Sequence, residues 1–114
     1  MGLDMYAFKR KPGEDQDANK EIDYWRKHPD LHGWMEDLYR VKGGNEHFNC
    51  VEVRLTADDL LRLKADVEAA ALPHTEGFFF SISLPEEREH DLEFIAKAQQ
   101  AIDDGYEVYY DSWW

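Results

Sequence analysis

The sequence predicts an α/β fold, a single domain in which a mixed sheet of about four strands carries helices mainly on one face. The length of 114 residues and the hydrophobic share of 43% suit one domain with one core. Along the chain, segments with the two-residue apolar period of strands are followed by segments with the apolar spacing of helices. Each single-helix connection between strands predicts parallel neighbours joined by a right-handed crossover.

The N-terminal part predicts a strand, a loop and a helix in that order. Residues 3–10 alternate as a strand with apolar groups on both faces. Residues 11–20, which are rich in Pro, Gly and polar side chains, predict a flexible surface loop. A short helix is expected over 21–27 and ends at His28, because Pro29 disfavours helical geometry in the residue before it.

The remaining elements follow from caps and periodicity. A helix is expected to start at Pro29 or Asp30 and to stop at Gly43, because glycine accepts the left-handed backbone that ends many helices. Thr56 with Asp59 three residues later resembles a capping box, so a helix should start there. The other expected elements are a helix that Pro85 opens and Gly105 closes, and strands over 48–55, 77–84 and 106–110.

The charge of the chain excludes some classes of partner. With 25 acidic against 13 basic residues the net charge is −12, which disfavours direct binding of duplex nucleic acid or of an anionic membrane. No membrane span and no signal peptide is apparent, so we expect a cytoplasmic protein. The acidic side chains could imitate nucleic acid, but they are spread over every predicted helix, which favours a role in solubility.

Aromatic and cationic side chains gather at 24–35 in this otherwise acidic protein. Such a surface suits a planar or anionic small ligand, and it equally suits a protein hot spot. The alternative is that the two tryptophans of the segment are core anchors with solvated bases between them. The candidate binding residues in this segment are Tyr24, Trp25, Arg26, His28, His32 and Trp34.

The chain ends in two tryptophans that an open terminus would leave exposed. Trp113 and Trp114 follow a predicted strand, so we expect at least one of them to pack on the core. Both join the candidate binding surface. Arg26, His32 and Trp34 are expected to share that surface, because a bend at Pro29 would fold two short helices toward each other.

Other potential chemistry is weaker. His28 and His32 are spaced like zinc ligands on one helix, but Pro29 interrupts the helix and no third ligand is evident, so no metal and no cofactor is expected. Cys50 lies in a predicted strand and is expected to be buried and unreactive. The chain has no Walker loop, no dinucleotide-binding glycine motif and no nucleophile elbow.

Several motifs together resemble a small family of proteins found in bacteriophages and bacterial genomes. They are MGLDMY at 1–6, YWRKH at 24–28, LHGWM at 31–35, FNC at 48–50, GFFF at 77–80 and SWW at 112–114. Members sometimes carry the label phosphoglycerate kinase, but 114 residues are too few for a two-lobed kinase. The resemblance implies a phage or prophage setting and a one-domain fold, and it brings no catalytic residues.

Two classes of function are compatible with these features. The first hypothesis is a phage-type accessory protein, not an enzyme, that engages a host protein or sequesters a small ligand through the aromatic and cationic surface. The alternative is a small enzyme with Arg26, His28, His32 and Cys50 around a pocket. An enzyme requires these side chains to converge on a cleft.

Overall fold

The computed structural model describes residues 3–73 and 86–114. Within these ranges the chain forms four strands, three α-helices and one 3₁₀ turn. In order they are β1 (Asp4–Arg10), the turn η1 (Gln16–Ala18), β2 (Lys20–Arg26), α1 (Pro29–Val41), β3 (Val53–Leu55), α2 (Ala57–Glu68), α3 (Glu87–Asp103) and β4 (Glu107–Trp113). The predicted strand at 77–84 lies outside the described residues.

The four strands form one sheet in the order β2-β1-β4-β3. Every described pair of neighbours is antiparallel. The parallel neighbours predicted from single-helix crossovers involve the strand expected at 77–84, so this prediction lies outside the described residues. A loop over residues 11–19, which contains η1, joins β1 to β2 as a hairpin, and the two described helices α2 and α3 come between β3 and its neighbour β4 in the sequence.

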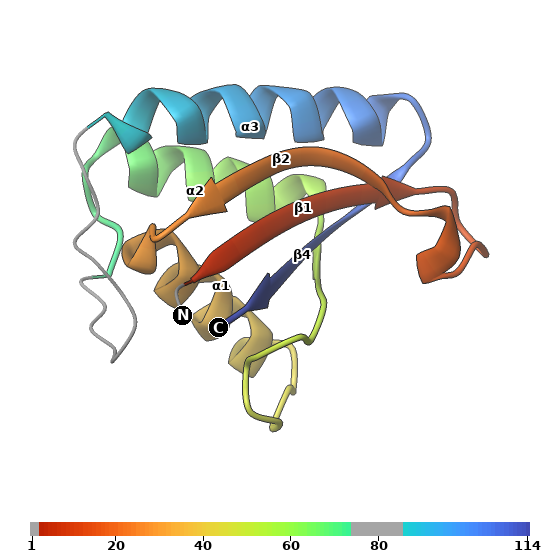
Figure 1. The fold of residues 1–114 in the computed structure, drawn as a ribbon. Helices are drawn as coiled ribbons and strands as arrows, with labels where there is room; N and C mark the ends of the chain where they lie inside the picture. The colour runs from red at the N-terminus through yellow and green to blue at the C-terminus, as the bar shows by residue number, and fades with distance from the viewer. Residues whose placement is uncertain (1–2, 74–85) are drawn as a thin grey trace.

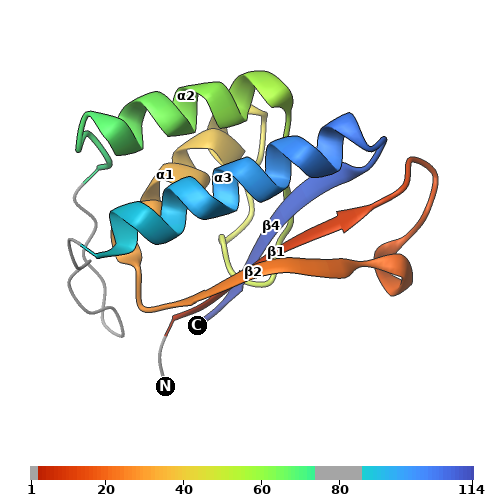
Figure 2. The same ribbon diagram turned by 90° about the horizontal axis from the view of Figure 1, so that it is seen from above.

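The three helices cover one face of the sheet, and no other helix or strand of residues 3–73 and 86–114 covers the second face (Figures 1 and 2). This arrangement confirms the predicted α/β class with about four strands and helices on one face. The core lies between the layers, where alternate strand residues meet the helices. Its largest fully buried side chains include Trp25, Tyr110, Phe48, Phe94 and Met35.

The predicted helix at 21–27 is wrong, because this segment is the edge strand β2. Its backbone pairs with β1, with Met5 opposite Trp25 and Tyr6 opposite Tyr24. A bulge near Ile22 shifts the register, which disturbs the alternation that would have revealed a strand. The expected loop at 11–20 holds the 3₁₀ turn at 16–18, and its last residue already belongs to β2. The flexibility of this loop stays a prediction.

The predicted strand at 48–55 is reduced to its last three residues, Val53–Leu55. Cys50 precedes this strand with a positive φ of 60° and is exposed, so the prediction that it is buried is wrong. Its backbone N–H donates to the carbonyl oxygen of Ser112 at 2.7 Å, which ties the segment to β4. The expected lack of thiol reactivity therefore loses its structural basis.

The predicted start of α2 is confirmed. Thr56 is the N-cap and forms a reciprocal capping box with Asp59. Burial alone would raise the pKa of Asp59, but hydrogen bonds from Lys42, Thr56 and Arg62 outweigh it and lower this pKa to about 2. The carboxylate thus links α2 to the end of α1, because the Nζ of Lys42 lies 2.6 Å from it.

The helix α1 also begins and ends where the sequence predicts, with Pro29 in its first turn and Gly43 in the left-handed conformation after it. None of the helices in the described parts of the chain is both long and apolar enough to span a membrane.

Candidate functional site

The structure separates three residues that the sequence placed on one surface. Arg26 is exposed, and its Nε lies 3.9 Å from the Oδ1 of Asp4. His32 is buried, whereas Trp34 is half-buried and donates its indole N–H to Asp66 at 2.8 Å. His32 and Trp34 are two positions apart on α1 and therefore project to different sides of the helix. The predicted clustering of Arg26, His32 and Trp34 is wrong.

His32 belongs to an aromatic cluster between α1 and β4. Its Nδ1 lies 2.7 Å from the hydroxyl oxygen of Tyr110, and its ring contacts Phe48 and Trp114. Burial lowers the pKa of His32 to about 4, because the apolar surroundings disfavour the imidazolium. Burial also raises the pKa of Tyr110 well above its usual value. Both rings are therefore neutral at pH 7.

The two terminal tryptophans have opposite environments. Trp114 packs against the core and donates its indole N–H to the carbonyl oxygen of Phe48 at 3.0 Å. Asn49 exchanges two further hydrogen bonds with the backbone of Trp114, at 2.7 and 3.1 Å. Trp113 is 66% exposed. The prediction that at least one of the pair packs on the core is confirmed by Trp114.

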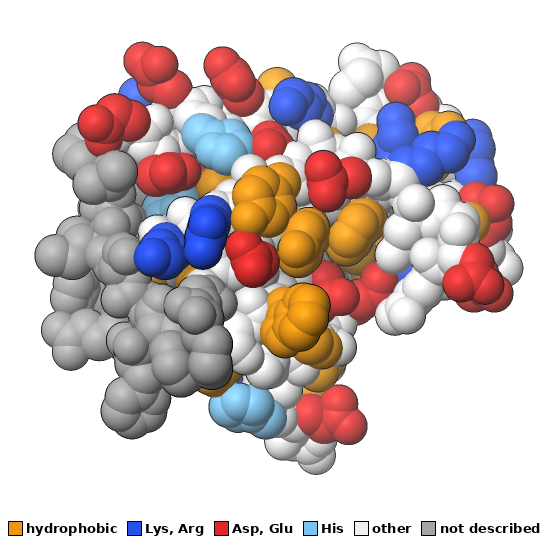
Figure 3. All heavy atoms as spheres, in the orientation of Figure 1, with side chains coloured by type: hydrophobic (Ala, Val, Ile, Leu, Met, Phe, Trp, Pro, Cys, Tyr) orange, Lys and Arg blue, Asp and Glu red, His pale blue; other side chains and the backbone are white. Residues whose placement is uncertain are grey.

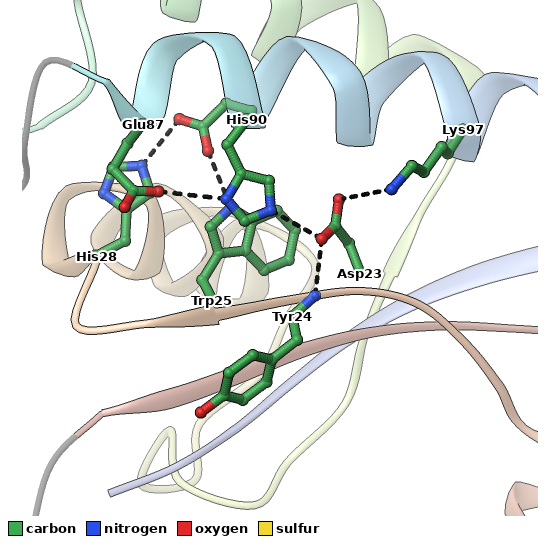
Figure 4. Close-up of polar contacts among 8 residues, drawn as sticks. Asp23, Tyr24, Trp25, His28, Glu87, His90 and Lys97 are labelled. Carbon is green, nitrogen blue, oxygen red and sulfur yellow. Dashed lines mark hydrogen bonds and ion pairs between the residues drawn. The ribbon is translucent and has the colours of Figure 1, made fainter.

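A buried polar network links β2 and the start of α1 to α3 (Figure 4). His28, the residue before α1, is 2% exposed, and Asp91 on α3 is 1% exposed. The Nε2 of His28 lies 2.8 Å from Oδ2 of Asp91, while the indole N–H of Trp25 donates to Oδ1 at 3.1 Å. Each oxygen of the Asp91 carboxylate thus has a hydrogen-bond partner, Trp25 for Oδ1 and His28 for Oδ2.

The network continues along α3 toward the edge of the sheet. His90 stacks on Trp25 with ring centroids 5.1 Å apart, as Figure 4 shows. Its Nε2 lies 2.7 Å from Oδ1 of Asp23, and its Nδ1 lies 3.4 Å from Oε2 of Glu87. Lys97 approaches the second oxygen of Asp23 at 3.5 Å. The imidazole of His90 therefore lies between the carboxylates of Asp23 and Glu87.

The uncovered face of the sheet carries a row of aromatic side chains. Figure 3 shows hydrophobic side chains gathered in the middle of this face. We use the name open-face strip for the aromatic side chains that the strand register places on this face. Neighbouring rings touch: Tyr6 lies 5.9 Å from Phe8 and 5.2 Å from Tyr24 between centroids. The strip comprises Tyr6, Phe8, Tyr24, Tyr109 and Trp113, which share the strand parity opposite to the buried residues.

Two carboxylates lie within the open-face strip. Asp4 accepts a hydrogen bond from the Tyr24 hydroxyl at 2.6 Å, and this bond raises the pKa of Tyr24 to about 12. Asp111 is paired with Tyr6 in the sheet register, and burial raises its pKa. No Lys or Arg in residues 3–73 or 86–114 forms an ion pair with Asp111. Its half-buried charge is therefore uncompensated by a cation of the described chain.

A second cationic and aromatic cluster lies at the far end of the sheet. Lys9, Lys11 and Lys20 place their Nζ atoms 4.6, 4.3 and 5.8 Å from the centroid of the Tyr106 ring. Next to it, a shallow hollow of about 510 Å³ opens between β2 and α3. The strand register brings these lysines together, and nothing in their sequence spacing indicates it.

Comparison of the chain with family models, with curated protein sequences and with solved structures finds no significant match.

Sequence reasoning missed most of the residues that build these two regions. The polar network depends on Asp91 and His90 of α3. The favourable interaction with the helix dipole already accounted for the acidic residues at the start of this helix, so nothing there indicated a site. The open-face strip depends on Tyr6 and Phe8, whose parity in the first strand did indicate a second apolar face. Of the predicted binding residues, Tyr24 and Trp113 belong to the strip, and Arg26 lies beside it.

Proposed function

We propose that this protein is a binding protein without catalytic activity, which holds a segment of another protein on the uncovered face of its sheet. The open-face strip supports this proposal, because Tyr24 and Trp113 are 39% and 66% exposed and lie on neighbouring rows of the same sheet. Tyrosine and tryptophan offer a large contact area at low cost in side-chain entropy, and they dominate protein hot spots.

The carboxylates of the strip indicate the chemistry of the partner. Asp111 is half-buried without a cation from the described chain, and binding would bury it further. An arginine of the partner would neutralise this charge and stack on the neighbouring tyrosine ring. A partner segment that carries arginine therefore fits the strip better than an acidic one.

An exposed aromatic sheet face could also stack the bases of single-stranded nucleic acid. Such binding requires a positive groove along the phosphate backbone. Here the net charge is −12, and the arginines of this face, Arg10, Arg26 and Arg54, are already paired with the carboxylates of Glu52, Asp4 and Glu107. The electrostatics therefore favour a protein segment over a nucleic acid.

Two expectations from the sequence remain part of the proposal. The resemblance to phage and prophage proteins makes a host protein the proposed partner, in the cytoplasm of the host cell. The alternative of a small enzyme required Arg26, His28 and His32 to converge with Cys50 on a pocket. In the structure they have separate surroundings, since Arg26 lies near Asp4 while both histidines are buried. This separation supports binding over catalysis.

The proposal is tested with a random peptide library displayed on yeast and the purified full chain as bait. We expect enriched peptides to contain arginine, and their binding to be lost with Trp113→Ser or Tyr24→Ser. Asp111→Asn should weaken arginine peptides specifically, because it removes the charge while preserving shape. Leu61→Ser on α2, where Leu61 is 58% exposed, is the matched control and should bind normally.

Two outcomes would contradict the proposal. One is enrichment of peptides that bind Trp113→Ser and the original chain equally well. The other is tight binding of fluorescent oligo-U or oligo-dT that Trp113→Ser abolishes, which would assign the strip to single-stranded nucleic acid instead.

A further inference from the structure

Three metal-ligating side chains meet between the start of α1 and the start of α3. They are His28, Glu87 and Asp91, and one potential ligand atom from each lies within 4.8 Å of the other two. His28 precedes α1, whereas Glu87 and Asp91 are one helical turn apart on α3. We propose that these three residues bind a divalent first-row transition-metal ion, with Zn²⁺ as the expected ion.

Burial distinguishes this cluster from an ordinary group of surface acids. His28 and Asp91 are almost completely buried, and Figure 4 shows the side chains of His28 and Glu87 close together beside the first turn of α3. The Oε2 atom of Glu87 is also buried, and within the described residues it accepts no hydrogen bond, although Nδ1 of His90 approaches it at 3.4 Å. A buried carboxylate oxygen that accepts no hydrogen bond is costly, and a metal ion at this position would compensate it.

The donor set determines the class of ion. One imidazole nitrogen with two carboxylate oxygens suits Zn²⁺ and its first-row neighbours, whereas Ca²⁺ and Mg²⁺ prefer oxygen ligands alone. Three protein ligands leave one position of a tetrahedral ion for water. On binding, the ion replaces the proton shared between Nε2 of His28 and Oδ2 of Asp91, and that proton is released to solvent.

A second layer of contacts already orients the ligands. The indole N–H of Trp25 donates to Oδ1 of Asp91, which leaves Oδ2 directed toward His28. The Nδ1 of His90 lies 3.4 Å from the carboxylate of Glu87. Such outer contacts fix the orientation of metal ligands in proteins. The cluster lies on the helix-covered side of the sheet, so this inference is independent of the open-face strip.

The experiment uses the full chain after treatment with a chelator and follows Co²⁺ by its visible absorption bands. We expect one Co²⁺ per chain, displaced by Zn²⁺ but not by the same concentration of Ca²⁺. Glu87→Gln should weaken Co²⁺ binding by at least about tenfold, because it removes a charged ligand from a partly exposed position. Glu89→Gln, which changes an exposed acid in the same turn, is the control and should bind as the original chain does.

Asp91→Asn provides a second variant. The asparagine can still accept the hydrogen bond from Trp25, so the fold should survive while the ligand charge is lost. Circular dichroism checks folding, and if this variant unfolds, Glu87→Gln decides alone. The inference is overturned if millimolar Co²⁺ produces no bands with the original chain. It is also overturned if Glu87→Gln and Glu89→Gln bind Co²⁺ equally.

Discussion

Residues of the same types are buried and hydrogen-bonded on one face of the sheet and exposed on the other. On the helix-covered face, Trp25 and Tyr110 are buried and each polar atom of their rings has a side-chain partner. On the open face, Trp113 is mostly exposed and Asp111 lacks a cationic partner in the described chain. Adjacent residues of β4 alternate between these two environments.

This difference is consistent with the proposal that the aromatic residues of the chain have two roles. On the covered face the rings contribute to the free energy of folding, and their polar atoms are bonded because they have lost contact with water. On the open face we expect the exposed rings to contribute little to folding, as the proposed contact with another protein requires. The predictions below test this division, beginning with the largest expected effect.

The largest effect is expected from the two tryptophans that represent the faces. Trp25→Ala should lower the free energy of unfolding by about 3 to 5 kcal/mol, because it leaves a cavity in the core and removes the donor to Asp91. Trp113→Ala should change it by about 0.5 kcal/mol or less. Urea unfolding followed by circular dichroism measures both. A loss of similar size in both variants would mean that the two faces do not differ in this way.

A second difference is expected in the response to acid. The pKa of His32 falls from 6.5 to about 4 in the fold, so between these pH values the unfolded chain binds a proton that the folded chain does not. Protonation of His32 in the unfolded chain therefore leaves the free energy of unfolding unaffected above pH 6.5 and lowers it as the pH falls toward 4. The loss amounts to about 3 kcal/mol.

The variant His32→Gln isolates this contribution because glutamine does not titrate. Its free energy of unfolding should be lower than that of the original chain at pH 7, and should depend less on pH between 6.5 and 4. Unfolding in urea at several pH values measures the two slopes. Equal slopes would show that the fold does not lower the pKa of His32.

The smallest effect concerns two neighbouring tyrosines on opposite faces. Tyr110→Phe removes a buried hydroxyl that lies 2.7 Å from Nδ1 of His32, and should cost about 1 to 2 kcal/mol. Tyr109→Phe removes a hydroxyl that donates to Glu107 on the open face, and should cost less than about 0.5 kcal/mol. Thermal unfolding of both variants gives the comparison. The division between the faces would weaken if Tyr109→Phe were the more damaging change.

Local signals in the sequence predict helices in this chain better than strands. Pro29, Thr56 and Gly105 act within one helical turn, and the helices indeed begin or end near them. The sequence does not reveal the edge strand β2, because its pairing with β1 is a tertiary contact and a bulge disrupts the alternation of its side chains. The apolar residues around Cys50 predict a strand, but they belong to a loop that is bonded to β4 through the backbone of Cys50 and Ser112.

The candidate sites were less predictable than the fold. A sequence window shows that Tyr24, Trp25, Arg26, His28 and His32 are close along the chain. It does not show that β2 directs Tyr24 and Trp25 to opposite faces. Whether the predicted set binds a partner stays a prediction, while the expectation that it forms one surface is wrong.

The sequence by itself determined the α/β class, the helix boundaries set by local caps and the charge that disfavours nucleic acid, because these depend on composition and on contacts within a few residues. Only the tertiary structure decided the antiparallel order of the strands, the open-face strip and the meeting of His28 with Glu87 and Asp91. Those features join residues that are up to about a hundred positions apart in the chain, and a pattern read along the chain cannot reveal which of them will become neighbours.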